Sequence, residues 1–176
     1  MIISGARNES HFIQKIVNKI SDAKLNQTPI YVAEYPLGIN SRAEAIKSLL
    51  DIGLDIVCVV GIYGLPGVGK TTIAKAVCNK IAKHFDGSSF LENVREKLGK
   101  DIGIITLQEQ LLNDILGDGN WKVGNRFRGM SLIEKRLRCK KLFLILDDVD
   151  DSTRIENLLG KCNWFAPGSR DRKSVV

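Results

Sequence analysis

The sequence predicts an α/β fold, in which a mainly parallel sheet is flanked by helices. Residues 56–63 are apolar, as are residues 142–146 within a second run over 141–148 that ends in acid, and both runs lack the alternation of a half-exposed strand. Such continuous runs are typical of strands buried on both faces of a parallel sheet. Residues 88–94 are a further strand candidate, and segments with helical periodicity separate the three. Alternation of strands with helices indicates crossover units, which parallel strands require.

Length and composition favour an ordinary globular domain. The chain has 176 residues, of which 44% are hydrophobic and 26% charged. No segment reaches the roughly 20 apolar residues of a membrane-spanning helix, and the first residues form no signal-peptide core. We therefore expect no membrane span and a cytoplasmic location, with the nucleus as the alternative compartment.

Charge and cysteine spacing argue against two other classes of protein. The net charge is +6, but the basic residues are scattered and their densest clusters, 135–141 and 170–173, contain no interleaved aromatics. We therefore do not expect nucleic acid as a partner. The four cysteines lie far apart and form no C-x-x-C pair, which favours small buried side chains over a zinc site.

Residues 1–52 are predicted to form a linker and N-terminal helices. Apolar side chains recur at helical spacing over 8–23, and two prolines favour an extended segment over 28–36. Ser41 and Glu44 have the spacing of a capping box. They predict a helix that begins at Ser41, ends at Gly53 and packs through three apolar residues, Ile46, Leu49 and Leu50.

The helices expected after the first buried strand each show one apolar stripe. The first covers residues 71–83, and a turn at 85–87 follows it. The second covers residues 106–116. Their inward residues are expected to be Ile73, Ala74, Val77, Cys78 and Ile81 in the first, and Leu107, Leu111, Leu112 and Ile115 in the second.

The later part of the chain is predicted to contain a loop and two shorter helices. Residues 117–129 are polar and glycine-rich, which indicates a surface loop. A second capping box at Ser131 and Glu134 predicts a helix that runs to about residue 139. Residues 152–160 are predicted to form a short helix whose inward residues are Ile155, Leu158 and Leu159.

A glycine-rich motif follows the first buried strand directly and opens the first helix. It consists of Gly64, Leu65, Pro66, Gly67, Val68, Gly69, Lys70 and Thr71, and it matches G-x-x-x-x-G-K-[ST]. Its glycines let backbone N–H groups converge on an anion, and the helix N-terminus adds partial positive charge there. The motif therefore predicts a P-loop NTPase domain over residues 53–176 that binds the phosphates of a purine nucleotide.

The polar residues that end the motif have predicted roles. Lys70 is expected to reach the β- and γ-phosphates, and Thr71 to offer its hydroxyl to Mg²⁺. Thr72 is placed to contact the α-phosphate. The expected cofactors are ATP or ADP with Mg²⁺.

Two carboxylates, Asp147 and Asp148, follow the second buried run. At the carboxyl end of a strand in an open α/β sheet, they are expected beside the phosphate-binding loop. Asp147 is predicted to support Mg²⁺, directly or through water. Asp148 is placed to orient or deprotonate an attacking water, a catalytic role.

With both motifs present, the chain resembles the NB-ARC domain of plant disease-resistance receptors of the nucleotide-binding, leucine-rich-repeat type. Residues 61–72 resemble the family's phosphate loop, and 142–150 its Walker B segment. Two features have the form typical of receptors with an N-terminal TIR domain: residues 90–96, and Asp150, the last residue of the segment that resembles Walker B. Three shorter similarities add to these. Residues 9–25 and 32–42 resemble the family's linker, and within the latter, residues 38–42 resemble the stretch that borders adenine. Residues 167–170 resemble the start of the next strand's motif.

The resemblance implies a switch that is off with ADP and on with ATP, in defence signal transduction. In a full-length receptor, other receptor domains and self-association would supply the partners, and ATP hydrolysis would be slow at most. After Arg170 the family continues with a β-rich run and a phosphate-sensing arginine, a role that we do not assign to Arg170 or Arg172. The chain is therefore expected to be a fragment, truncated before the helical ARC subdomains.

Two alternatives remain at this point. One is a dedicated P-loop enzyme, such as a small-molecule kinase or an ATPase. A kinase would carry an arginine-rich lid, but the candidates at 126–128 and 136–138 are predicted to lie on a loop and a helix surface. The other alternative is a remnant that binds no nucleotide, because the family's adenine-side wall and sensor are missing from the sequence.

Overall fold

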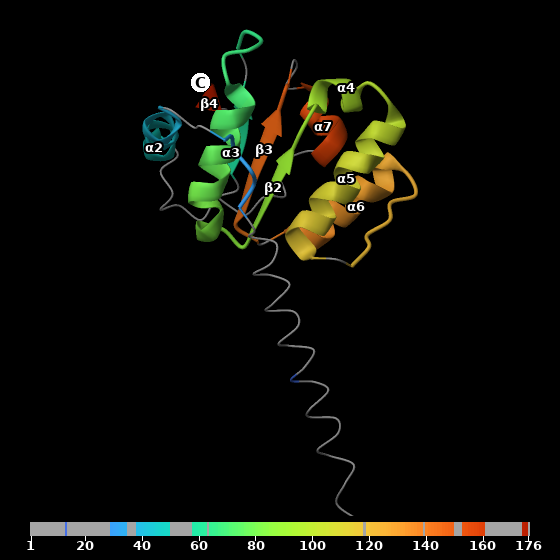
Figure 1. Cartoon of the computed structure of the whole chain (residues 1–176). Helices are drawn as coiled ribbons and strands as arrows, with labels where there is room; N and C mark the ends of the chain where they lie inside the picture. The colour runs from blue at the N-terminus through green and yellow to red at the C-terminus, as the bar shows by residue number, and fades with distance from the viewer. Residues whose placement is uncertain are drawn as a thin grey trace, which may run out of the picture.

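The structure is a computed structural model that describes residues 13, 29–34, 38–49, 58–62, 64–117, 119–138, 140–149, 153–160 and 174–175 (Figure 1). The predicted helix over 8–23, apart from Ile13, lies outside the described residues. The predicted domain boundary between residues 52 and 53 and the motif at 167–170 lie outside them as well. No helix within the described ranges is both long enough and apolar enough to cross a membrane.

The described residues form one parallel sheet, as the buried runs predict. The strand order is β2-β3-β1-β4, and all the strand pairs are parallel. The central pair is in register from Cys58 opposite Phe143 to Ile62 opposite Asp147. The short strand β4 is not predicted from the sequence. The strands are β1 (Cys58–Ile62), β2 (Gly87–Leu91), β3 (Leu142–Asp147) and β4 (Ser174–Val175).

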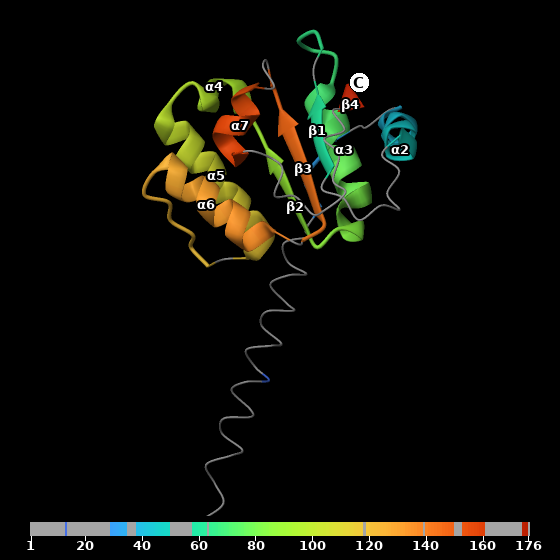
Figure 2. The same cartoon turned by 180° about the vertical axis from the view of Figure 1, so that it is seen from behind.

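Helices cover both faces of this sheet (Figures 1 and 2). α2 (Ile39–Leu49) and α3 (Lys70–Ile81) lie on one face, and α3 continues as a 3-10 turn, η1 (Ala82–His84). The other face carries α4 (Val94–Leu98), α5 (Asp101–Leu116), α6 (Arg126–Leu137) and α7 (Thr153–Leu159). The predicted α/β class with helices flanking a parallel sheet is therefore confirmed.

Strand β3 contributes to the core on both faces, because all its residues are buried. Phe143 and Ile145 pack with α2 and α3, whereas Leu142, Leu144 and Leu146 pack with α4–α7. Each fully buried side chain of this size stabilises the fold by roughly 1.5–3 kcal/mol. The prediction of a strand buried on both faces is confirmed for β3.

The predicted inward faces of the helices are confirmed in most positions. The expected residues of α5 are all buried, and those of α7 are buried except Ile155, which is partly buried. In α3 only Ile73 is partly buried, and Ala76 joins the stripe. In α2, Ile46 is buried as predicted and Ala43 is buried with it, whereas the predicted Leu49 and Leu50 side chains lie outside the described part of the structure.

Both predicted capping boxes are wrong. Helix α2 begins at Ile39, where Gly38 turns the chain with a φ of 69°, and the Ser41 hydroxyl donates to the Gly38 carbonyl at 3.0 Å. Within α6, the Ser131 hydroxyl donates to the Phe127 carbonyl at 3.1 Å. A serine inside a helix bonds a carbonyl three or four residues back, so the spacing alone does not distinguish it from a cap.

The N-cap of α6 is Asn125, whose Oδ1 accepts the Arg128 N–H at 2.9 Å. The predicted loop over 117–129 therefore ends earlier than expected, at the start of α6. The helix predicted over 106–116 also begins earlier than expected, because α5 starts at Asp101.

Strand β2 is shorter than predicted. It ends at Leu91, because Asn93 takes a left-handed conformation with a φ of 55° and α4 follows it.

Residues 29–34 are held against α3 by the Asn79 side chain and by the packing of Ile30 and Val32 on the core beneath it. Residues 29–34 lie outside helices and strands, as expected for an extended linker. The Asn79 amide accepts the Ile30 N–H through Oδ1 at 2.8 Å and donates to the Ile30 carbonyl through Nδ2 at 2.7 Å. This pair of bonds imitates strand pairing and holds the linker against α3.

Gln108 connects three helices on the opposite face. Its side chain is fully buried, and Nε2 donates to the Arg126 carbonyl at 3.0 Å and to the Leu158 carbonyl at 2.9 Å. A Cβ on Gly129 would overlap Gln108 Oε1. The close approach of α5 and α6 therefore requires glycine at this position.

We expect Gly129→Ala to lower the free energy of unfolding by roughly 1–3 kcal/mol, the usual cost of overpacking. This net loss is expected even though alanine favours a helix by about 1 kcal/mol over glycine. Urea unfolding followed by circular dichroism measures it. Gly124→Ala is the control, because a Cβ there meets nothing within 4 Å. Equal midpoints for the two variants would contradict the argument.

Candidate functional site

The candidate site lies where two neighbouring strands send the chain to opposite faces of the sheet. β1 is followed by α3 on one face, and β3 is followed by α7 on the other. Open α/β sheets bind ligands in the crevice that this divergence creates at the carboxyl ends of the strands. The loop over 64–69 and the carboxyl end of β3 lie at this edge of the sheet (Figure 1). Asp147 is the last residue of β3, and Asp148 follows it.

The loop depends on glycines with positive φ. Gly64, Gly67 and Gly69 have φ angles of 148°, 79° and 83°, which disfavour any residue with a Cβ. Gly69 is also the N-cap of α3, and no side chain caps this helix. The N–H groups of the first turn are the donors that a helix leaves unpaired, so they are directed at the crevice.

The predicted residues divide between the exposed loop and the first turn of α3. Leu65, Pro66, Gly67 and Val68 are exposed, with Leu65 at 76%. Lys70, Thr71 and Thr72 are half-buried at the start of the helix.

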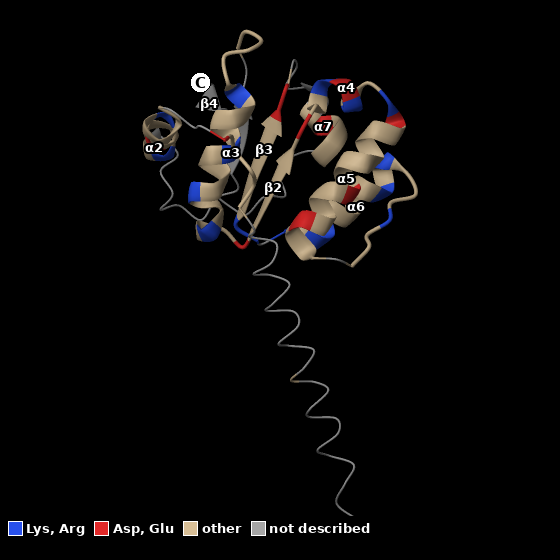
Figure 3. Ribbon diagram, in the orientation of Figure 1, with Lys and Arg blue, Asp and Glu red and all other residues tan. Residues whose placement is uncertain are grey.

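The Lys70 ammonium lies against the loop. Nζ donates to the Gly64 carbonyl at 2.7 Å and to the Leu65 carbonyl at 2.8 Å. Figure 3 shows the start of α3 in blue and the carboxyl end of β3 in red, so basic and acidic residues are found at the same edge of the sheet.

Thr71 and Asp147 are in direct contact. The Thr71 hydroxyl donates to Asp147 Oδ2 at 2.5 Å, although the two residues lie in different halves of the chain. Asp147 is only 6% exposed at the end of β3. The structure thus brings together the two residues predicted as Mg²⁺ ligands.

The donor set at this contact fits Mg²⁺. Magnesium prefers oxygen ligands and is usually held by one or two protein groups together with waters and substrate phosphates. A hydroxyl and a carboxylate supply such oxygens here. Thr71 and Asp147 would hold the ion, which would neutralise part of the phosphate charge.

Asp148 has a different partner from Asp147. Its backbone is left-handed, with a φ of 60°. The Asp148 carbonyl accepts the Arg95 N–H at 2.8 Å, and Oδ2 lies 3.2 Å from an Arg95 guanidinium nitrogen. The sequence analysis missed Arg95, which it treated only as part of a family motif. A basic residue just past the neighbouring strand was the available signal.

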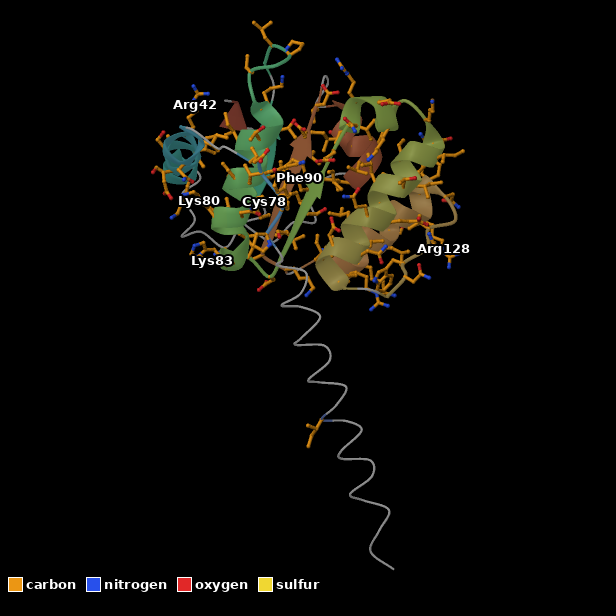
Figure 4. All side chains as sticks on the ribbon, in the orientation of Figure 1. Arg42, Cys78, Lys80, Lys83, Phe90 and Arg128 are labelled. Carbon is orange, nitrogen blue, oxygen red and sulfur yellow. The ribbon has the colours of Figure 1, made fainter. Side chains whose placement is uncertain are left out.

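A separate cavity of about 420 Å³ lies at the edge of β2, and none of the predicted site residues lines it. Figure 4 places two of its lining residues, Cys78 and Phe90, between α3 and β2. Burial, and to a lesser extent the nearby Asp114, raises the pKa of the Cys78 thiol to about 11. Burial also raises the pKa of Asp114, against the lowering effect of hydrogen bonds from Ser89 and Gln110. This cavity is distinct from the crevice at the loop.

A strand, a glycine-rich loop and a helix, beside a second strand that ends in an aspartate, define the P-loop NTPase fold. The NB-ARC domain family matches residues 39–169, which is most of the chain. The chain therefore belongs to the NB-ARC domain family.

Curated relatives agree with this assignment. The chain is 42% identical over 135 residues to disease resistance protein RUN1 of Vitis rotundifolia, covering 76% of this chain and 10% of that protein. It is 40% identical over 167 residues to disease resistance protein RML1A of Arabidopsis thaliana, covering 93% and 16%. It is 35% identical over 171 residues to TMV resistance protein N of Nicotiana glutinosa, covering 93% and 14%. The chain thus spans only a small part of the length of these relatives.

The contact between Thr71 and Asp147 predicts a change in stability. Thr71→Val keeps the shape of the side chain but removes the donor to a buried carboxylate, which should cost roughly 1–3 kcal/mol of unfolding free energy. Thr71→Ser keeps the hydroxyl and should lose less. Urea unfolding in EDTA measures both variants.

Thr106→Val serves as the control, because the Thr106 hydroxyl is exposed and bonds only the Ile102 carbonyl of its own helix, at 2.9 Å. If Thr71→Val and Thr106→Val unfold at the same urea concentration, the Thr71 hydroxyl does not stabilise Asp147.

Proposed function

We propose that this domain binds ATP or ADP with Mg²⁺ and serves as the nucleotide-dependent switch of an intracellular plant immune receptor. The observation that carries the proposal is the contact of Thr71 with Asp147. It joins the uncapped start of α3 to the end of β3, at the edge where open α/β sheets bind ligands. The names of the relatives, which are disease resistance proteins, support the biological setting.

Each residue of the motif has a proposed role at this edge. The backbone N–H groups between Gly64 and Gly69 surround the phosphates, together with those of the first turn of α3. Lys70 exchanges its loop carbonyls for oxygens of the β- and γ-phosphates. Thr71 and Asp147 hold Mg²⁺, Thr72 contacts the α-phosphate, and Asp148 orients the water in a slow hydrolysis.

The position of the other arginines supports a switch over a small-molecule kinase. The candidates for a kinase lid lie on α6 or, for Arg138, at its C-cap, in the layer that packs against α5. Arg126 lies 3.4 Å from Asp101, and Arg136 lies over the ring of Trp121. Figure 4 shows Arg128 on the side of the molecule away from the loop. Arginines held in this way do not close over a phosphate acceptor at the crevice.

In this proposal the receptor works in the cytoplasm, or alternatively in the nucleus. Its partners are the nucleotide, the other domains of the receptor and further copies of the receptor. Exchange of ADP for ATP changes the terminal phosphate at the edge of the sheet, and the change is passed on to those domains.

We expect Lys70→Ala to weaken binding of ATP and ADP by about tenfold or more, which corresponds to about 1.4 kcal/mol or more. The reason is the loss of a cation that contacts the phosphates. Calorimetric titration of the purified 176-residue chain, with and without Mg²⁺, measures the affinity. Lys83→Ala is the matched control, because Lys83 is exposed in η1, beyond the end of α3 that lies away from the loop (Figure 4).

Three outcomes would change the conclusion. Unchanged affinity in Lys70→Ala would overturn the role of the loop. Turnover above about 1 s⁻¹, within the usual range of enzymes, would favour a dedicated ATPase or kinase. A folded wild-type chain that binds neither nucleotide would identify a remnant.

A further inference from the structure

Arg95 holds Asp148 at two points, one on the backbone and one on the side chain. The Arg95 N–H donates to the Asp148 carbonyl at 2.8 Å, and the Arg95 guanidinium lies 3.2 Å from Asp148 Oδ2. Asp148 has a φ of 60°, a conformation that aspartate adopts more readily than most residues with a Cβ but that contacts from the surrounding structure still help to fix. Arg95, the second residue of α4, supplies that constraint.

This constraint separates two consecutive carboxylates. Asp147 is buried and accepts from Thr71 on α3, whereas Asp148 is partly exposed and pairs with Arg95 on α4. α3 and α4 cover opposite faces of the sheet. The left-handed turn therefore directs one carboxylate toward the predicted metal position and leaves the other at the open edge.

The ion pair contributes little to the stability of the fold. The side chains of Arg95 and Asp148 are 59% and 42% exposed, and exposed pairs of this kind are weak in water. The backbone hydrogen bond from Arg95 to the Asp148 carbonyl involves no charged group, but it fixes the orientation of the Asp148 backbone. The combined effect of the two contacts is to fix where the Asp148 carboxylate points.

We propose that Arg95 is a positioning residue for ATP hydrolysis, and that it orients the Asp148 carboxylate toward the attacking water. The inference rests on the proposed function. A carboxylate has two oxygens that accept hydrogen bonds, so with Oδ2 against Arg95, Oδ1 accepts the hydrogen bond of the water.

The reaction is hydrolysis of the terminal phosphate. The water oxygen forms a bond to the γ-phosphorus, and the bond from that phosphorus to the bridging oxygen breaks. The electron pair of that bond leaves with ADP, and the water proton passes to Asp148. Arg95 acts on this sequence only through the orientation of Asp148.

The test compares binding and rate in Arg95→Gln, Arg95→Lys, Asp148→Asn and the double variant Arg95→Gln with Asp148→Asn. Single-turnover hydrolysis of saturating ATP with Mg²⁺ gives the rate, and titration gives the affinity. We expect Arg95→Gln to lower the rate about tenfold or more, as for other groups that assist proton transfer, and to change the affinity less than twofold. Arg95→Lys should restore part of the rate. The double variant should be no slower than Asp148→Asn, because the two residues act as a unit.

Arg126→Gln is the matched control. Arg126 also forms an exposed ion pair, with Asp101 at 3.4 Å, but on α6. It should leave both rate and affinity unchanged.

Other results would overturn the inference. A loss of affinity in Arg95→Gln at an unchanged saturated rate would make Arg95 a phosphate contact instead. Additive losses in the double variant would show that Arg95 does not act through Asp148. Nucleotide binding with no hydrolysis in the wild type would remove the inference and leave the proposed binding function intact. Absence of binding would remove the proposed function, and the inference with it.

Discussion

The burial of β3 on both faces is the constraint on which the rest of the domain depends. Its side chains alternate between two cores, so a shift of one residue would exchange Phe143 and Ile145 with the leucines beside them. The register that fills both cores also brings Asp147 to the end of the strand, opposite Ile62 of β1. A carboxylate can end a fully buried strand there because the Thr71 hydroxyl reaches it. Packing and the candidate site are therefore fixed by the same strand.

Helix α3 is the second element that joins the site to the rest of the molecule. Its first turn follows the glycine-rich loop over 64–69, and its polar side chains contact the segments around it. Because a helix of this length moves as a rigid element, a displacement of its first turn would also move those contacts. Thr71 contacts Asp147 of β3, and Lys75 contacts Glu92 at the end of β2. Asn79 contacts Ile30 of the linker, and Lys80 contacts Glu44 of α2.

The sequence was sufficient for features that depend on local pattern. The apolar runs located β1 and β3, the periodicity located the inward faces of α3 and α5, and the motif located the loop. It was insufficient for helix starts, since Ser41 and Ser131 have the spacing of caps but bond within their own helices. It also misassigned Gly129 to a loop, because the reason for that glycine is Gln108 on another helix. Such tertiary contacts leave no periodic signal in the sequence.

The edge of the sheet shows most clearly why the remainder was not predictable. Asn93 and Asp148 both take left-handed conformations just beyond the ends of β2 and β3, which are neighbouring parallel strands. Asn and Asp adopt this conformation more readily than other residues with a Cβ. The Arg95–Asp148 backbone bond joins the first turn of α4, which begins after Asn93, to Asp148. Departures from local rules are expected at functional sites, where surrounding contacts compensate their cost. The two turns lie at the edge where the glycine-rich loop over 64–69 also lies, so conformations that are uncommon for residues with a Cβ gather at the candidate site.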